Sequence, residues 1–411
     1  MTPTHRTGLP RLLALTAFSM AAAFGSAQAQ EAFPIAKASV KPVDDSFYVS
    51  PPDATLNAVA PGTVLRYRPI PLGSYASFVK EAYQLMYRST GQKGQPTAAI
   101  TTVLIPSNAP LAGRKVFSYQ SFYDSLTLNC TPSYLTVRGS LFEESNVDPV
   151  LKAGHVVVLS DYEGLQSQWI AGKNTAHGVL DGIRAAIKFN KTGLAANAAV
   201  GMMGFSGGGH ATGWAAEMAP TYAPELNIVG AAMGGVPANV GNVARKVDGT
   251  LFAGVYLAAV VGLSRAYPEI DPARYATPAG LDAMDDISNR CLLGMFQGQP
   301  EILWRYAGKK GTTYLKDANF LDLPEIADII RENNMGSRIP KAPLYVYQGT
   351  LDEIMVMKDV DDLVKTYCDA GVKVQYHRAI NDHLLMAINP GPARNYVLDR
   401  LAGKTAPSNC R

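Results

Sequence analysis

A glycine-flanked serine in the middle of the chain constrains its fold more than any other feature. The pentapeptide Gly-Phe-Ser-Gly-Gly at 204–208 follows an apolar run, 198–203, and precedes a stretch with helical character, 209–218. The pattern predicts a strand, a sharp turn with Ser206 at its apex, and a helix, which is the context that a G-x-S-x-G nucleophile elbow requires. Such a turn strains the serine backbone, so the residues two positions before and after it must be very small, as both glycines are.

The helix predicted after this turn also suits chemistry at Ser206. Its start at Gly207 would direct free backbone N–H groups and the positive end of the helix dipole toward the place where an oxyanion would form. A glycine-rich turn with an incidental serine is the alternative, because 37 of the 411 residues are glycine. The strand before the motif and the helix after it favour a nucleophile.

The N-terminus predicts export. His5, Arg6 and Arg11 precede an apolar stretch, 12–24, and an A-x-A site that ends at Ala29. These three parts are typical of a secretory signal peptide, 1–29, that is cleaved after its last residue. The apolar stretch is too short to anchor the chain in a bilayer. We therefore expect a mature protein that is secreted or periplasmic and carries no transmembrane segment.

Charge and cysteine content narrow the classes of function. Cleavage would remove two arginines from the 37 basic residues and leave all 34 acidic ones, so the mature chain would be almost neutral. Near-neutrality argues against nucleic acid as a partner. The sequence has no C-x-x-C and no histidine pair at ligand spacing, so we expect no metal site. Four cysteines in an exported chain predict two disulfides with three conceivable pairings, or else free buried thiols: Cys130, Cys291, Cys368 and Cys410.

Apolar strand candidates alternate with helical patterns after a proline-rich entry. The strand candidates are 98–105, 115–119, 155–159, 198–205, 227–232, 343–347 and 373–379, and the helical ones are 174–190, 207–218 and 357–370. Several strands are nearly continuous apolar runs, as in Val156-Val157-Val158-Leu159, which is typical of strands that are buried on both faces. The sequence therefore predicts an α/β fold, with a mainly parallel sheet and helices on both faces.

One long interval interrupts this alternation. About a hundred residues between the strand that ends near Met233 and the strand that begins at Pro343 have helical rather than strand character. A structureless loop of that length is implausible in a compact protein. We therefore expect a helical cap or lid at 237–340, inserted between two parts of the core, 30–236 and 341–411.

A serine nucleophile needs a base, and the base needs an orienting acid. In the α/β-hydrolase arrangement these residues follow in the order Ser, acid, His, each on a loop after a strand of the sheet. The strand 344–347 precedes Asp352, and the strand 373–379 precedes His383. The carboxyl ends of neighbouring parallel strands meet where such sheets gather ligands. We therefore expect Asp352 to be the acid and His383 to be the base.

Other histidines and carboxylates fit these roles less well. One further histidine belongs to the signal peptide and four lie on predicted strands or helices: His5, His155, His177, His210 and His377. A surface histidine near the C-terminal helix is the alternative interpretation of His383. Glu353 and Asp382 are close rivals for the acid. Asp161 also ends a strand, but it precedes the serine, which is the wrong order for this fold.

These motifs together resemble the secretory lipase family, the lipase-A type first known from yeasts. The resemblance rests on the glycine-flanked serine, on the order Ser206, Asp352, His383, and on a helical insertion before the acid. Asp-Tyr-Glu-Gly at 161–164 and Leu-Asp-Gly-Ile-Arg at 180–184 are similar to two signatures of the family. We interpret their aspartates as structural residues that are hydrogen-bonded to backbone. The resemblance covers most of the mature chain and is weakest in the cap.

The resemblance implies further roles. The segment 118–125 resembles the strand and loop that carry the family's oxyanion contributor, so the oxyanion hole would use the backbone N–H groups of Gly207 and Asp124. A loop-capping aspartate is the alternative for Asp124. The family also implies which disulfides form, the first of them joining the oxyanion loop to the cap: Cys130–Cys291 and Cys368–Cys410.

The sequence is thus interpreted as a secreted carboxylic-ester hydrolase, first of all a triacylglycerol lipase, that needs no cofactor. Ser206 would attack the ester carbonyl while His383 takes its proton, Asp352 would hold the imidazole, and water would release the acyl-enzyme. An esterase for short-chain or soluble esters is the alternative, and a peptidase on the same fold is a weaker one. A catalytically silent binding module is an alternative of another class, although all three positions are filled here.

The cap bears on the substrate. Its apolar stretch from Leu251 to Leu263 is either a buried helix or a lid surface that meets lipid or an acyl chain, and few charges lie nearby. We therefore expect an acyl ester with an apolar chain as the substrate, and a lipid–water interface contacted through the cap.

Overall fold

The computed structural model describes residues 1–2, 30–108, 113–294 and 298–410. Apart from its first two residues, the predicted signal peptide therefore lies outside the described residues. Within the described ranges, no helix combines the length and the apolar character needed to cross a membrane.

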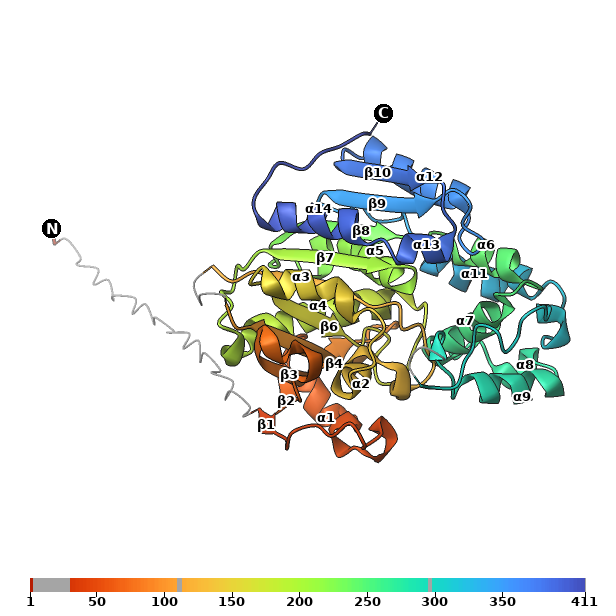
Figure 1. The fold of residues 1–411 in the computed structure, drawn as a ribbon, viewed down its shortest axis with the longest axis horizontal. Helices are drawn as coiled ribbons and strands as arrows, with labels where there is room; N and C mark the ends of the chain where they lie inside the picture. Colours follow the sequence, from red (N-terminus) through yellow and green to blue (C-terminus); the bar gives the residue numbers. More distant parts are fainter. Residues whose placement is uncertain (3–29, 109–112, 295–297, 411) are drawn as a thin grey trace.

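A mainly parallel sheet runs through the middle of the molecule (Figure 1). The strands found in the described residues pair in the order β1-β2-β3-β4-β6-β5-β7-β8-β9-β10. Pairing is parallel from β6 through β5 and β7 to β10, and antiparallel among β2, β3, β4 and β6. The bounds are β1 Glu31–Ala32, β2 Val64–Pro69, β3 Val79–Thr90, β4 Pro96–Pro106, β5 Val116–Gln120, β6 Val156–Ser160, β7 Val200–Phe205, β8 Ile228–Gly234, β9 Leu344–Gly349 and β10 Val374–Ala379.

Helices cover both faces of this sheet, as the continuous apolar strands predict. In β6, Val156 and Val158 pack into the core beneath α4 (Gly172–Lys188), α5 (Gly207–Tyr222) and α12 (Met357–Asp369). Val157 and Leu159 pack on the opposite face, beneath α3 (Glu144–Lys152) and α14 (Gly391–Leu401). Because successive side chains of a strand point to opposite faces, a strand between two helical layers must be apolar at every position.

The antiparallel strands β2 and β3 are absent from the sequence-based prediction. β3 carries several polar residues, and one of them, Gln84, is fully buried. Its Oε1 accepts a hydrogen bond of 2.7 Å from Arg68 Nε, and its Nε2 donates one of 2.7 Å to the carbonyl of Ser133. A buried polar side chain whose partners come from elsewhere in the chain breaks the apolar pattern without breaking the strand.

Between β8 and β9 the chain forms helices with an apolar core of their own, on one side of the sheet (Figure 1). These helices are α6 (Val240–Val247), α7 (Ala253–Ala266), α8 (Pro272–Tyr275), α9 (Pro278–Ile287) and α11 (Pro324–Asn333). α7 contains most of the apolar stretch predicted for the cap, and most of its side chains are buried, which fits the interpretation as a buried helix. The predicted boundaries of the cap fall in the segments that flank α6 and α11, and the division into domains stays a prediction.

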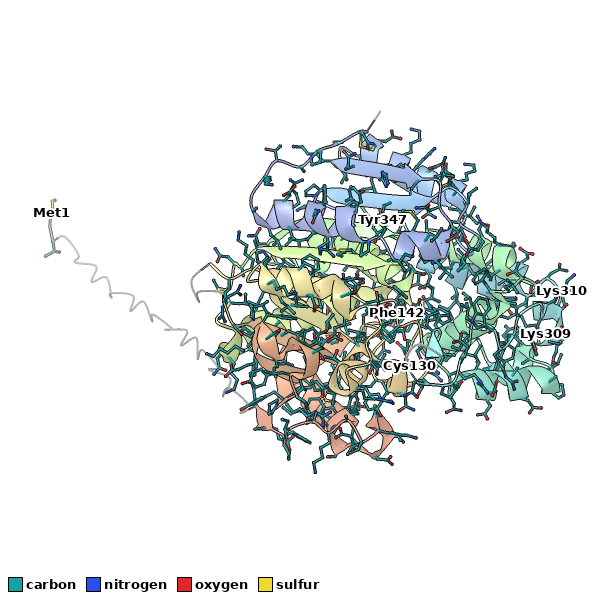
Figure 2. All side chains as sticks on the ribbon, in the orientation of Figure 1. Met1, Cys130, Phe142, Lys309, Lys310 and Tyr347 are labelled. Carbon is teal, nitrogen blue, oxygen red and sulfur yellow. A yellow bond between two sulfur atoms is a disulfide. The ribbon has the colours of Figure 1, made fainter. Side chains whose placement is uncertain are left out.

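The remaining short helices are α1 (Asp53–Asn57), α2 (Pro132–Arg138) and α13 (His383–Ala387). Two disulfides cross-link the molecule in the pairing that the family resemblance implies. Cys130–Cys291 joins the segment after β5 to the segment after α9, and Cys368–Cys410 joins α12 to the C-terminal segment. Cys130 is labelled in Figure 2, where it lies between the sheet and the helices of the β8–β9 interval.

Candidate active site

Ser206 forms the turn between β7 and α5, and its backbone has φ 54° and ψ −122°. A residue other than glycine in this region of φ stores roughly 1–3 kcal/mol of strain, which is frequent at functional sites. The neighbouring glycines leave no room for a side chain. A Cβ on Gly204 would lie 2.1 Å from the carbonyl oxygen of Gly208, and a Cβ on Gly208 would lie 1.9 Å from that of Gln120. The tight turn therefore depends on both glycines.

The three residues predicted to form a triad lie in one hydrogen-bonded chain. Ser206 Oγ is 2.9 Å from His383 Nε2, and His383 Nδ1 is 2.7 Å from Asp352 Oδ2. All three side chains are buried, so these bonds form in surroundings of low dielectric constant. The serine follows β7, the aspartate follows β9 and the histidine follows β10, so the carboxyl ends of three parallel strands bring them together.

Asp352 is held by donors on both carboxylate oxygens. Its Oδ1 accepts from the backbone N–H groups of Ile354 (2.9 Å) and Met355 (2.7 Å), and its Oδ2 also accepts from Gln348 Nε2 (2.7 Å). Burial alone would raise the pKa of Asp352, but the hydrogen bonds from His383 and the backbone outweigh it and lower that pKa. The carboxylate is therefore ionised at neutral pH, and it favours the His383 tautomer with its proton on Nδ1.

The rival acids of the sequence analysis have other partners. The sequence analysis expected His383 on a loop, but His383 is the first residue of α13. Asp382 caps that helix and accepts from the N–H of Leu385 at 2.8 Å. Glu353 accepts from the backbone N–H of His383 at 3.0 Å. Both carboxylates therefore fix the backbone around the histidine, and the imidazole Nδ1 is bonded to Asp352 instead.

The aspartates of the two family-like signatures differ in their bonding. Asp161 accepts from the backbone N–H of Ser133 at 2.9 Å and from its hydroxyl at 2.5 Å, which matches the expected structural role. The expectation of backbone partners is wrong for Asp181, which accepts from side chains instead: Ser89 (2.9 Å), Arg184 (2.8 Å) and Tyr222 (2.8 Å). Its role is still to join elements, because these donors come from β3, α4 and α5.

Asp124 lies directly beside the turn that holds Ser206. It follows β5, has φ 33° and is buried. Its carboxyl accepts a 3.0 Å hydrogen bond from Trp169 Nε1 and another from the backbone N–H of Gly207. Burial raises the pKa of Asp124 to about 7, against the effect of these two bonds. The two residues predicted to form an oxyanion hole are thus adjacent, and the Asp124 carboxyl occupies the N–H of Gly207 in this structure.

Two buried glutamates hold the loop that carries Asp124. Glu143 accepts from the Ser121 hydroxyl and, at 3.2 Å, from the N–H of Phe122. Glu163 accepts from the N–H of Ser125 at 3.4 Å. The sequence analysis did not single out either residue as part of the site. Glu163 lies within the Asp-Tyr-Glu-Gly signature, which could have directed attention to it, whereas no motif surrounds Glu143.

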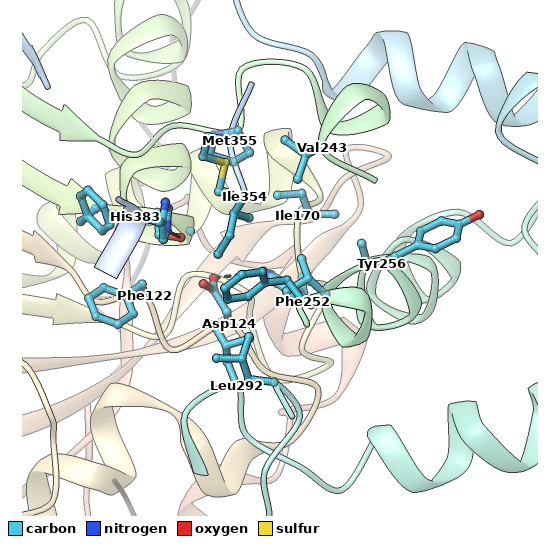
Figure 3. Close-up of a pocket in the computed structure, with 18 of the residues that line it drawn as sticks. Phe122, Asp124, Ile170, Val243, Phe252, Tyr256, Leu292, Ile354, Met355 and His383 are labelled. Carbon is cyan, nitrogen blue, oxygen red and sulfur yellow. Dashed lines mark hydrogen bonds between the residues drawn. The ribbon is translucent and has the colours of Figure 1, made fainter. Parts of the chain in front are cut away.

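An apolar pocket opens over the serine and histidine (Figure 3). The segment after β5 contributes Asp124 and Phe122, the loop after β9 contributes Met355, and α13 contributes Leu384. Nearly half of the lining residues come from the β8–β9 interval: Pro237, Val240, Val243, Ala244, Phe252, Val255, Tyr256, Ala259, Leu292, Leu293 and Leu303. Within the described ranges, no group of three or more histidine, cysteine or acidic side chains is arranged to hold a metal ion.

Comparison with known proteins places this chain in a family. The sequence profile described as "Secretory lipase" matches residues 133–409, more than half of the chain. The chain belongs to the secretory lipase family. Membership of this family makes the chain a carboxylic-ester hydrolase. The matched range contains Ser206, Asp352 and His383.

Relatives of this secretory lipase span almost its whole length. Lipase 5 of Candida albicans is 34% identical over 396 residues, which cover 90% of this chain and 83% of the relative. A protein described as a probable inactive lipase, from Mycobacterium tuberculosis, is 33% identical over 380 residues, which cover 88% of this chain and 83% of the relative.

A solved structure supports the same assignment at the level of the fold. Candida antarctica lipase A in its closed state matches this secretory lipase with a TM-score of 0.83 and 30% sequence identity. The match covers 90% of this chain and 88% of that one. Because only a tenth of the chain is unmatched, the structural match includes most of the inserted helices as well as the α/β-hydrolase sheet.

Proposed function

We propose that this secretory lipase is an exported triacylglycerol lipase whose nucleophile, base and orienting acid are Ser206, His383 and Asp352. The observation that carries the proposal is the pair of hydrogen bonds, 2.9 Å and 2.7 Å, that joins the three side chains at the base of an apolar pocket. A strained serine within hydrogen-bonding reach of an imidazole that a carboxylate orients has the arrangement that nucleophilic acyl transfer requires.

In the first half of the reaction, Ser206 Oγ attacks the ester carbonyl and its proton passes to His383 Nε2. The carbonyl oxygen becomes an oxyanion, which the N–H groups of Gly207 and Asp124 stabilise. The leaving alcohol takes the proton back from the imidazolium, and an acyl-serine ester remains. Water then repeats the sequence and releases the fatty acid, while Asp352 stabilises the imidazolium in both halves.

The Asp124 carboxyl must give up its contact with the N–H of Gly207 when the oxyanion forms. Its Trp169 partner comes from the loop before α4, so the carboxyl keeps one donor while the other becomes free. The family resemblance assigns the oxyanion contact of Asp124 to its backbone N–H rather than to its side chain, and this exchange leaves the N–H of Gly207 free as the second donor.

The pocket favours an acyl chain over a polar substrate. A second apolar cavity, between α6, α7 and α11, shares several lining residues with the first: Ile170, Val240, Ala244, Tyr256 and Ala259. A linear apolar substituent could therefore extend from the serine into the interior of the inserted helices. The predicted signal peptide and the two disulfides support a secreted or periplasmic location, because disulfides persist in oxidising compartments.

Hydrolysis of p-nitrophenyl esters from acetate to palmitate, with emulsified tributyrin in parallel, tests this proposal on the mature protein and on a Ser206→Ala variant. We expect activity on long-chain and emulsified substrates, and a loss of about 10⁴-fold or more in kcat in the variant. Circular dichroism and the thermal midpoint show whether the variant is folded.

Each other outcome has a definite meaning. Activity confined to short esters would replace the triacylglycerol lipase by an esterase. Equal activity of the two proteins would reject Ser206 as the nucleophile. A folded wild-type protein with no activity on any ester would favour the catalytically silent binding module.

A further inference from the structure

Large aliphatic side chains are exposed around α13, immediately after the histidine of the site. This surface, called here the α13 ridge, consists of Leu351, Ile380, Leu384, Leu385 and Ile388, whose exposed fractions are 64%, 83%, 43%, 49% and 67%. Isolated exposed apolar residues are common on soluble proteins, but a group of this kind marks an interaction surface.

The members of the ridge are neighbours in space as well as in sequence. Leu384 and Ile388 are four residues apart, and the N–H of Ile388 donates to the carbonyl of Leu384 at 3.2 Å, so both side chains project from one face of a helical turn. On the other side, the N–H of Leu351 donates to the carbonyl of Asn381 at 3.1 Å. The loops after β9 and β10 therefore form one surface with α13.

The ridge is continuous with the apolar pocket. Leu384 and Ala387 line that pocket together with Ser206 and His383. In Figure 1, α13 lies on the side of the sheet where α6, α7 and α11 gather, at the place where the pocket is formed. An acyl chain that leaves an aggregate at the ridge would therefore reach the serine without crossing a polar surface.

The ridge also lacks the charges that would bind an anionic surface. Between Ala379 and Ala393 the only Asp, Glu, Lys or Arg is Asp382, which is engaged as the cap of α13. Of the charged residues just beyond, Arg378 is paired with Asp361, and Glu353 accepts from the backbone N–H of His383. Two lysines that are consecutive in the sequence, Lys309 and Lys310, lie at the outer edge of the inserted helices, away from the sheet (Figure 2). Electrostatic attraction to acidic lipid would thus act elsewhere than at the ridge.

We propose that the α13 ridge is the surface on which this protein docks to an uncharged lipid–water interface, with Leu385 and Ile388 inserted among the acyl chains. The inference rests on the proposed function, because it takes the pocket as the acyl site. It moves the lipid contact from the apolar stretch of the inserted segment, which is largely buried in α7, to the C-terminal part of the core.

Sedimentation with phosphatidylcholine vesicles tests the docking surface, using the mature protein and a double variant, Leu385→Gln with Ile388→Gln. Neither side chain lines the pocket. We expect the partition coefficient to fall about tenfold or more, because two aliphatic side chains no longer enter the apolar layer. Hydrolysis of soluble p-nitrophenyl acetate should stay within twofold of wild type. Val43→Gln is the matched control, since Val43 is 82% exposed but precedes α1, at the opposite end of the sheet.

Three results would overturn the proposal. The double variant could bind vesicles as well as wild type, or binding could require phosphatidylserine, which would indicate an electrostatic contact. Analytical ultracentrifugation could also show a wild-type dimer that the double variant abolishes, which would make the ridge a protein interface. Vesicle binding of a Ser206→Ala protein is measured without any hydrolysis, so failure of the docking surface and failure of the proposed reaction are separate observations.

Discussion

In the proposed reaction, attack by Ser206 depends on which nitrogen of His383 carries the proton. Asp352 decides this through its 2.7 Å bond to Nδ1, and its other donors leave its carboxylate no freedom to rotate. Replacement by asparagine keeps the size of the side chain but supplies an amide in place of a carboxylate oxygen. The histidine can then satisfy that amide with the opposite tautomer, which puts a proton on Nε2 and blocks its role as base.

We therefore expect Asp352→Asn to lower kcat by about 10⁴-fold with little change in fold. Initial rates on a soluble p-nitrophenyl ester measure the effect. Glu353→Gln is the matched control, because Glu353 accepts from the backbone N–H of His383 and its loss should cost far less activity. Similar losses in the two variants would mean that the backbone position of His383, and not its tautomer, is what the acid controls.

The residues of the site differ in how far the sequence predicts them. Ser206, Asp352 and His383 each come shortly after a strand, at a tight turn, a loop and the start of a helix, so strand pattern and chain order are enough to predict them. Trp169 donates to Asp124, which lies 45 positions earlier in the chain, and Glu143 accepts from Phe122, which lies 21 positions earlier. Nothing in the local sequence of Trp169 or Glu143 records these contacts. A single sequence does not show which distant residues folding brings into contact.

At the scale of elements, α5 has a buried carboxyl that connects it to the rest of the molecule. Glu217 accepts hydrogen bonds of 2.6 Å from the N–H of Gly336, in the segment after α11, and from the hydroxyl of Tyr367 on α12. Burial raises the pKa of Glu217 to about 7, even though the Tyr367 bond acts to lower it. The helix that begins beside Ser206 is thus fixed at its other half by a carboxyl that is largely protonated below neutral pH.

The raised pKa predicts a pH dependence of stability. The folded state keeps a proton on Glu217 up to about pH 7, whereas the unfolded chain loses it near its ordinary pKa of 4.5. The free energy of unfolding should therefore fall as the pH rises from about 4.5 to about 7, by roughly 3 kcal/mol from this group, and change no further above that.

Glu217→Gln removes this one titration and retains an acceptor for Gly336 and Tyr367. Urea unfolding of both proteins at pH 5 and pH 8 isolates the effect, since the other buried carboxyls titrate in both. We expect the stability of the variant relative to wild type to rise by about 3 kcal/mol between the two pH values. Parallel changes in both proteins would mean that Glu217 is already ionised at pH 5.

The burial of each strand explains which strands the sequence predicts. The parallel strands β5 to β9 lie mostly between two layers of helices, so their runs of apolar residues identify them directly, whereas β10 is partly exposed and mixes polar with apolar residues. β3 is a long strand with Lys80, Glu81 and Arg88, and its polar positions are accommodated by antiparallel neighbours and by side-chain partners. A search for apolar runs therefore locates β4 and most of the parallel strands, and it passes over β2 and β3 toward the antiparallel edge.

At the scale of the whole molecule, the two disulfides constrain chain segments of very different length. Cys130–Cys291 spans 161 residues and Cys368–Cys410 spans 42. In the chain-entropy account a longer closed loop gives more stabilisation, and the difference between these two is about 1 kcal/mol. Replacing each pair by alanines should therefore cost more stability for the first pair, measured by urea unfolding of the oxidised proteins.

The first pair should also affect the reaction. Cys291 forms a β-bridge with Ser125, the residue after Asp124, so loss of the disulfide loosens the oxyanion loop. We expect lower kcat on soluble esters without Cys130–Cys291 and unchanged kcat without Cys368–Cys410. Equal stability losses and equal rates would show that neither loop length nor the link to Asp124 matters.

The inserted helices enter and leave the core at a single place. Just outside β8 and β9, the N–H of Met335 donates to the carbonyl of Ala238 at 3.0 Å, and the N–H of Val240 donates to Asn334 Oδ1 at 3.0 Å. Between these paired ends the inserted stretch is tied to the site by the Cys130–Cys291 disulfide and by Lys246 Nζ, which donates to the carbonyl of Asp352 at 2.7 Å. Since that stretch supplies nearly half of the residues that line the pocket, a lineage that keeps these ties could change the acyl group of the proposed substrate while inheriting Ser206, Asp352 and His383.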